Sequence, residues 1–154
     1  MALNSGTIKD LAGNAATLTL AAPGASGSLG ASKAIVIDGV LPTISSAAAN
    51  GGTKTLTLTM SEAVTGTPAA ADFAVVSSGQ ENAVTAVSVS GTSVVLTLTN
   101  VIVNDATVTV GYTQSTGADS TKLADGAGNF VADTSSNVTA TITNDTTLPT
   151  VSSV

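Results

Sequence analysis

The side chains best suited to chemistry in this chain are aspartates and asparagines in two short, glycine-containing loops. They are Asp10 with Asn14, and Asp125 with Asn129. Carboxylate and amide oxygens are the ligands that Ca²⁺ prefers in proteins. The same residue types also form Asx turns and tolerate left-handed backbone, so turn formation is the alternative explanation for each loop.

A tag that occurs twice places further acids at the ends of a domain. One copy begins at Asp38 and the other at Asp145, and each continues into a Leu-Pro pair. The offset is 107 for the two aspartates and also for Pro42 and Pro149. Glu62 ends an alternating segment, where a solvated acid is the alternative to a ligand. The candidate calcium ligands are Asp38, Asp145, Asp125, Asn129 and Glu62, which have to converge from separate loops.

The ionisable residues argue against several functional classes. The 154 residues include ten acids, four lysines, no arginine, no histidine and no cysteine, for a net charge of −6. Without histidine and cysteine the chain lacks the usual zinc ligands and nucleophile–base pairs, so we expect no enzyme. The absence of a basic face argues against nucleic acid binding. The sequence has no long apolar run and no signal-peptide pattern, so we expect no membrane insertion.

The pattern of apolar residues indicates an all-β fold. Threonine and valine favour strands, and segment 54–60 alternates so that Leu56, Leu58 and Met60 point inward. The same alternation recurs along the chain. The predicted strands are 43–48, 54–60, 73–76, 84–89, 93–99, 106–112 and 138–143, with a helical turn over 69–72. Seven strands at this spacing predict an immunoglobulin-like antiparallel β-sandwich.

The two tags also predict how the chain is divided. Residues 38–145 form one complete sandwich, and residues 146–154 start the next repeat. Residues 1–37 repeat the end of the sandwich, because their Asp-Gly loop and following strand match 125–129 and 138–143. They are therefore expected to be the last strands of a preceding repeat plus a linker. The chain is predicted to be a tandem-repeat unit with an extra N-terminal strand segment.

Two runs of sequence resemble bacterial Ig-like domains. The first is 55–64, TLTLTMSEAV, and the second is 108–113, VTVGYT, followed by the loop 125–129. They are similar to the repeats of giant bacterial surface proteins, including swimming-motility-associated repeats and large adhesins. Met60 stands where that family usually has Phe, and 39–41 replaces its Thr-Thr-Ala.

The resemblance implies a non-catalytic structural repeat of a stalk, adhesin or fibre. It implies a place at the cell surface or outside the cell, as part of a larger secreted protein. It further implies joints between neighbouring repeats that are stiffened by Ca²⁺. The partners expected on this basis are neighbouring repeats of the same protein.

The N-terminal segment allows a second hypothesis. Its strand has no domain of its own, so it can pair with a groove or sheet edge in another copy of the chain and build a filament by strand donation. The residues concerned are Lys33, Ala34, Ile35, Val36 and Ile37. The alternative is a frayed tail without such a role. An isopeptide bond between Lys54 and Asn137 is a further alternative, although the aromatic-rich pocket that such bonds need is missing.

Overall fold

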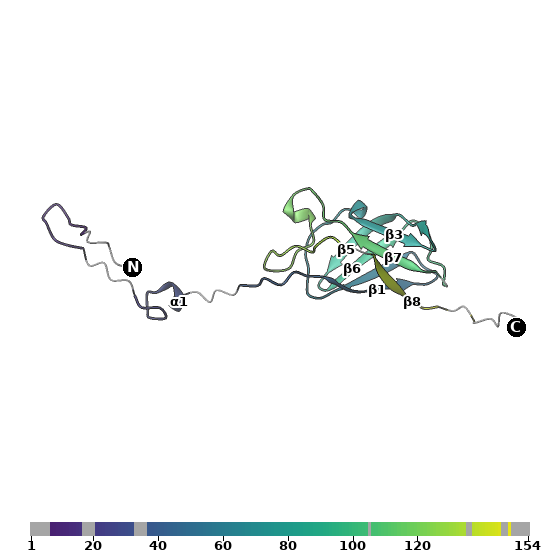
Figure 1. Cartoon of the computed structure of the whole chain (residues 1–154), viewed down its shortest axis with the longest axis horizontal. Coiled ribbons are helices and arrows are strands. Elements are labelled where there is room, and N and C mark those ends of the chain that lie inside the picture. The colour runs from purple at the N-terminus through teal and green to yellow at the C-terminus, as the bar shows by residue number, and fades with distance from the viewer. Residues whose placement is uncertain are drawn as a thin grey trace. The chain divides into compact units, whose positions relative to one another are not determined.

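The computed structural model describes residues 7–16, 21–32, 37–104, 106–134, 137–145 and 148. The chain forms two units, Met1–Ile37 and Asp38–Val154. In the first unit, a loop is closed by the bridge between Lys9 and Ala15, and α1 spans Leu29–Ser32 (Figure 1). The strand expected over 33–37 falls almost entirely outside the described residues. None of the described helices is long and apolar enough to cross a membrane.

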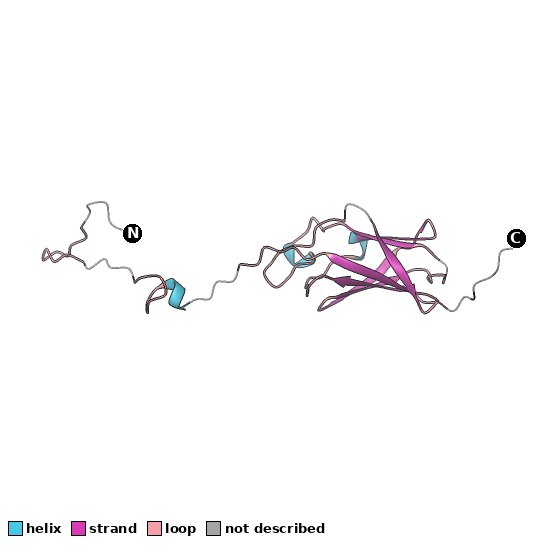
Figure 2. Ribbon diagram, turned by 60° about the horizontal axis from the view of Figure 1, so that its bottom comes forward, coloured by secondary structure: helices cyan, strands magenta, loops and turns pink. Residues whose placement is uncertain are grey.

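The second unit is all-β, as the sequence predicts, and its described residues form eight strands in one curled sheet (Figure 2). The strands are β1 Ile44–Asn50, β2 Thr55–Met60, β3 Phe73–Ser77, β4 Gln80–Glu81, β5 Val84–Ser90, β6 Ser93–Leu98, β7 Val108–Tyr112 and β8 Val138–Thr143. Their order across the sheet is β4-β3-β7-β8-β1-β2-β6-β5. Two short 3-10 turns, Ala70–Asp72 and Asp119–Thr121, lie in the loops.

The strand pairing corrects the expectation of seven antiparallel strands. β4 is an additional strand that pairs with β3, and β1 pairs with β8 in parallel through Ala48–Asn50 and Thr141–Thr143. The first half of β8 pairs with β7 instead, so β8 joins the two halves of the sheet. Alternation in a sequence shows which face a side chain occupies, but it leaves the neighbouring strand and its direction open. The purely antiparallel prediction was therefore wrong.

Both halves of the curled sheet contribute to one core. The inward positions that the sequence predicts in β2 are confirmed, because Leu56 and Leu58 are fully buried and Met60 is 3% exposed. β6, β7 and β3 supply further large side chains of the core. These are Val94, Leu96, Leu98, Val108, Val110, Tyr112, Phe73 and Val75. The rings of Phe73 and Tyr112 lie 5.1 Å apart, so two of the three aromatic residues of the unit meet in its interior.

The parallel pairing of β1 and β8 gives the second unit two distinct ends. At the end where both strands begin, the backbone N–H of Thr43 donates to the Ser61 hydroxyl and the N–H of Ser61 donates to the Thr43 carbonyl. At the end where both strands finish, Gly51 N–H donates to the Thr143 carbonyl over 2.8 Å. We call these the N-terminal end and the C-terminal end of the unit.

Candidate functional site

A loop held by Asp125 forms the centre of the candidate site. One carboxylate oxygen of Asp125 accepts the backbone N–H groups of Ala127 and Asn129, both at 2.8 Å. The other accepts the side-chain amide of Asn129, also at 2.8 Å. Gly128 adopts φ +91°, which suits glycine and closes the turn. The Asn129 side-chain bond lowers the pKa of Asp125, so its carboxylate is held in the charged form.

The first unit contains the same arrangement. Asp10 accepts the backbone N–H of Asn14 at 2.8 Å and the side-chain amide of Asn14 at 2.9 Å. Gly13, with φ +89°, takes the place of Gly128. The bridge that closes the loop joins Lys9 to Ala15, whereas Ala124 is bridged to Phe130 in the second unit. The two loops therefore share backbone geometry as well as sequence, and turn formation is one role that both aspartates have.

Glu62 reaches the Asp125 loop because its segment is bonded to that loop. Glu62 follows the end of β2, and three residues later Thr65 pairs with Ala124 through two backbone bonds of 2.7 and 3.0 Å. Gly66 approaches this loop so closely that a Cβ at its position would collide with the Lys122 carbonyl. The strand end and the loop are thereby fixed against each other.

Asp38 reaches the same place from the linker. Its carboxylate accepts the backbone N–H of Val40 at 3.1 Å, which forms a local turn. Its backbone carbonyl accepts the side-chain amide of Asn129 at 3.1 Å. Asn129 therefore connects the linker aspartate with Asp125, and this contact spans 91 positions of sequence.

The structure thus brings four of the five candidate ligands together at the N-terminal end of the second unit. One carboxylate oxygen from each of Asp38, Glu62 and Asp125 lies within 4.8 Å of the other two. Partial desolvation of Glu62 and the charges of Asp125 and Asp38 raise its pKa. The one salt bridge among the described residues joins Lys122 to Asp119, so no lysine there neutralises the three carboxylates by an ion pair. The arrangement is suited to a cation with oxygen ligands.

The fifth candidate, Asp145, lies elsewhere. It follows β8 at the C-terminal end, where the side-chain amide of the preceding Asn144 donates to the Asn50 side chain at 2.8 Å. Asp145 is the counterpart of Asp38 in the next tag, and the two tags lie one repeat length apart. Asp145 is therefore expected at the opposite end of the second unit from Asp38. The residues around the start of the next repeat fall mostly outside the described part of the chain.

Other residues singled out by the sequence are not placed together. Lys33, Ala34, Ile35 and Val36 lie outside the described residues, and Ile37 is 89% exposed. Lys54 stands at the C-terminal end, where its carbonyl accepts the N–H of Leu98. Asn137 immediately precedes β8 and therefore lies at the N-terminal end. The isopeptide alternative has no support from this arrangement.

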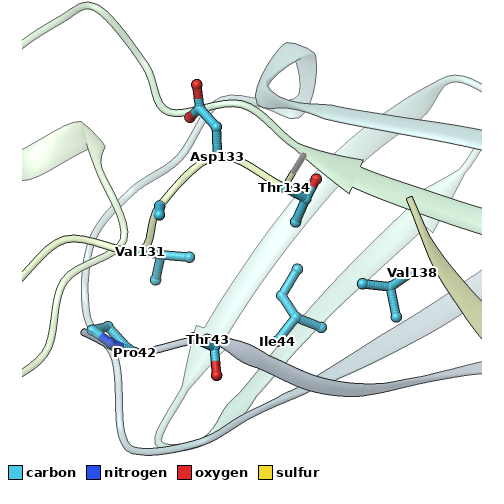
Figure 3. Close-up of a pocket in the computed structure, with 8 residues that line it drawn as sticks. Pro42, Thr43, Ile44, Val131, Asp133, Thr134 and Val138 are labelled. Atoms are coloured by element: carbon cyan, nitrogen blue, oxygen red, sulfur yellow. The ribbon is translucent and has the colours of Figure 1, made fainter. Parts of the chain in front are cut away.

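A shallow groove near the site was missed by sequence reasoning. It has a volume of about 250 Å³ and is lined by Pro42, Thr43, Ile44, Val131, Ala132, Asp133, Thr134 and Val138. Val131, Ile44 and Val138 point into it, whereas the Asp133 carboxylate points away (Figure 3). The groove exists because the starts of β1 and β8 are not paired with each other. Among the residues that line the groove, Pro42 is the one that the sequence had singled out, because it belongs to the tag.

Comparisons with solved structures show the same fold. The chain is similar to the N-terminal part of the bacterial S-layer protein SbsC, with 24% identity over 66% of this chain and a TM-score of 0.50. For a structure of domains 1–6 of SbsC, the values are 23% identity, 73% of this chain and a TM-score of 0.53. The chain spans only 24% and 15% of those two structures. No curated protein matches the chain.

A family of repeats matches the sequence itself. The matched residues are 37–117, just over half of the chain, and the family is described as a "Putative flagellar system-associated repeat". This match begins at the junction of the two units and includes Asp38 and Glu62. It agrees with the resemblance to swimming-motility-associated repeats that the strand motifs show. The chain therefore belongs to this family of flagellar system-associated repeats.

Proposed function

We propose that the chain is a structural, non-catalytic repeat of a larger bacterial surface protein, an immunoglobulin-like module whose task is length and cohesion. The observation that carries this proposal is the position of Asp38. It belongs to the tag that starts a repeat, yet it lies against Glu62 and Asp125 from the body of that repeat. Asp38 lies within the second unit, and its contacts fix the start of the repeat to the body of that repeat. A defined start to each repeat suits a stalk, adhesin or fibre.

Calcium is the cation that we propose for this joint. Ca–O distances of about 2.3–2.6 Å place the ligand oxygens of one ion at most about 5 Å apart. The three carboxylates meet this condition at 4.8 Å. The Asn129 side chain holds both the Asp38 backbone and the Asp125 carboxylate in position. Asp145 would be the corresponding calcium ligand at the start of the next repeat.

Thermal unfolding with and without millimolar CaCl₂ tests the joint. Binding to the folded state alone raises the melting temperature. We expect such a rise for the natural chain and a much smaller one for Asp38→Asn. Glu81→Gln is the matched control, because Glu81 is an exposed acid on β4, outside the cluster. An equal response of both variants, or no response of the natural chain, would contradict the proposed site.

The surface location is testable separately. Antibodies raised against residues 38–145 should label intact cells of the source organism or its shed extracellular material. Labelling that appears only after the cells are permeabilised would contradict a surface role. Antibody labelling does not depend on calcium, so this experiment tests the surface location separately from the calcium site.

A filament joined by strand donation is the second candidate. The observation that favours it is the Asp10–Asn14 loop, which reproduces the loop that precedes β8 in the second unit. A first unit that carries this loop is expected to carry the following strand, Lys33–Ile37, as a donor for another copy. Removal of residues 1–37 should then abolish filaments in electron micrographs. Filaments that persist without this segment would argue against donation.

A further inference from the structure

The exposed apolar side chains of the second unit lie at its ends and in the second tag. Among the described residues of this unit, the large apolar side chains that are at least half exposed are Val40, Leu41, Val101, Val103 and Leu148. Val40 and Leu41 precede β1 at the N-terminal end. Val101 and Val103 lie in the loop between β6 and β7 at the C-terminal end, and Leu148 follows β8 in the second tag. The faces and edges of the sheet, as far as the structure describes them, expose none to this extent.

The residue between the two valines fixes them at the C-terminal end. The backbone N–H of Ile102 donates to the Thr53 carbonyl at 2.6 Å, and the N–H of Gly52 donates to the Ile102 carbonyl at 2.9 Å. The Ile102 side chain is fully buried, whereas Val101 and Val103 are 51% and 65% exposed. Two apolar side chains are thereby held on the outside of this end.

The end of β8 is fixed at the same end of the unit. The Thr143 carbonyl accepts the Gly51 N–H, and the Thr143 hydroxyl donates to the Ala49 carbonyl at 3.2 Å. Asn144 has a φ of +55°, a left-handed conformation that asparagine tolerates. Its side-chain amide donates to the Asn50 side chain at 2.8 Å. The chain therefore leaves the repeat in a fixed direction.

One residue, Asn144, separates this fixed end from the next tag. Asp145 is the counterpart of Asp38, whose carboxylate lies with Glu62 and Asp125 at the N-terminal end of this repeat. Two residues of extended chain span at most about 7 Å. In a tandem array, the start of the following repeat therefore lies within about 7 Å of Thr143. The N-terminal end of that repeat then faces the C-terminal end of this one.

We propose that Val101 and Val103 form an apolar contact with the N-terminal end of the following repeat, across each joint of the array. The inference rests on the proposed role as a structural repeat and names the surface that binds its neighbour. The receiving end exposes Leu41, whose counterpart in the second tag is Leu148. It also contains the shallow apolar groove at the starts of β1 and β8. Burial of these apolar surfaces against each other favours the contact.

A small contact is sufficient because the two ends are covalently joined. A short linker gives the second end an effective concentration in the millimolar range. The contact therefore does not need the roughly 800 Å² per partner that an independent complex buries. The joint already places the following repeat within reach of the valines, so this repeat is the occupant that we infer. The two ends differ, so the contact is head-to-tail and continues along the array.

A protein with two consecutive repeats tests the proposal. It consists of residues 1–144 followed by residues 38–154, so that Asp38 of the second copy takes the place of Asp145. Methyl NMR in the presence of EDTA should give two sets of signals for Val101 and Val103. The second copy should give the signals of the natural chain, and the first copy should give a shifted set. The melting temperature should rise above that of the natural chain by about 4 °C.

The position of one pair of substitutions provides the matched control. Val101→Ser together with Val103→Ser in the first copy should remove the rise in melting temperature. The same pair in the second copy should leave the rise in place, because these residues then face no following repeat. The local effect of the substitutions is the same in both copies, so the difference between the two variants measures the contact.

A single set of valine signals at the positions of the natural chain would overturn the proposal, and so would equal melting temperatures for the two variants. Coupling that appears only after CaCl₂ is added would assign the joint to the metal ion and exclude an apolar contact. The measurements in EDTA depend neither on calcium nor on a cell surface. Their failure is therefore distinguishable from a failure of the calcium site or of surface labelling.

Discussion

The folded structure shifts the pKa values of Asp125 and Glu62 in opposite directions. Asp125 has a lowered pKa because Asn129 and backbone N–H groups bind its charged form. Its carboxylate stabilises the fold above its unfolded-state pKa, and this contribution is lost as the pH falls through the folded-state pKa. Glu62 has a raised pKa, first through desolvation and then through the two aspartates. Its contribution is fully present below its unfolded-state pKa and is lost as the pH rises through its folded-state pKa.

The two pKa shifts lead to a prediction for substitutions of Glu62 and Asp125. Without calcium at neutral pH, Glu62→Gln should raise the melting temperature, because it removes a carboxylate that is repelled by two others. Asp125→Asn should lower it, because its amide group opposes the amide of Asn129. Both variants should lose most of the response to CaCl₂. Thermal unfolding by circular dichroism measures all four values, and a Glu62→Gln variant that is less stable without calcium would contradict the electrostatic argument.

The sequence predicted part of this residue-level arrangement. Asp125 and Asn129 are recognisable from the loop pattern, and Glu62 from its position at a strand end. Their convergence with Asp38 depends on the Thr65–Ala124 pairing, which brings together residues far apart in sequence and leaves no local pattern. Asp145 was grouped with them because the tags are equivalent, although equivalent positions of a repeat lie one repeat length apart.

At the level of elements, the contact between the Thr65 segment and the Asp125 loop determines whether the carboxylates meet. The segment donates from Thr65 to the Ala124 carbonyl at 2.7 Å and from Thr67 to the Ser120 carbonyl at 3.0 Å. Gly66 lies between these two bonds with φ +128°. A side chain there is strained by the backbone and collides with the Lys122 carbonyl.

Gly66→Ala should therefore destabilise the second unit by about 2–3 kcal/mol and weaken the calcium response as well. Gly79→Ala is the control, because Gly79 also has a positive φ of +77° but nothing lies within 4 Å of a Cβ at its position. It should cost about 1 kcal/mol and leave the calcium response intact. Denaturant unfolding compares the two variants. Equal losses would mean that the close approach at Gly66 is unimportant.

The elements themselves show where sequence patterns succeed. Alternation located the inward residues of β2 because one face of the strand must be buried. It did not reveal β4, which has two residues and is too short to alternate. Nor did it reveal the parallel pairing of β1 with β8, because a parallel neighbour imposes the same alternation as an antiparallel one.

At the level of the whole molecule, the second unit contains the hydrophobic core that the described residues form. The buried apolar residues of that core all lie between Ala47 and Ala140. Residues 38–154 are therefore expected to fold without residues 1–37 and to melt at the same temperature as the full chain. Differential scanning calorimetry of both lengths checks this. A large loss of stability on truncation would show that the first unit contributes to the fold of the second.

Calcium titration calorimetry of the full chain is the most direct test of the joint. Among the described residues, one complete set of carboxylates is present, from Asp38, Glu62 and Asp125, so we predict one bound Ca²⁺ per chain at neutral pH. Asp38→Asn should abolish this binding while Glu81→Gln preserves it. The absence of binding by the natural chain, or binding that survives Asp38→Asn unchanged, would contradict a calcium-held joint.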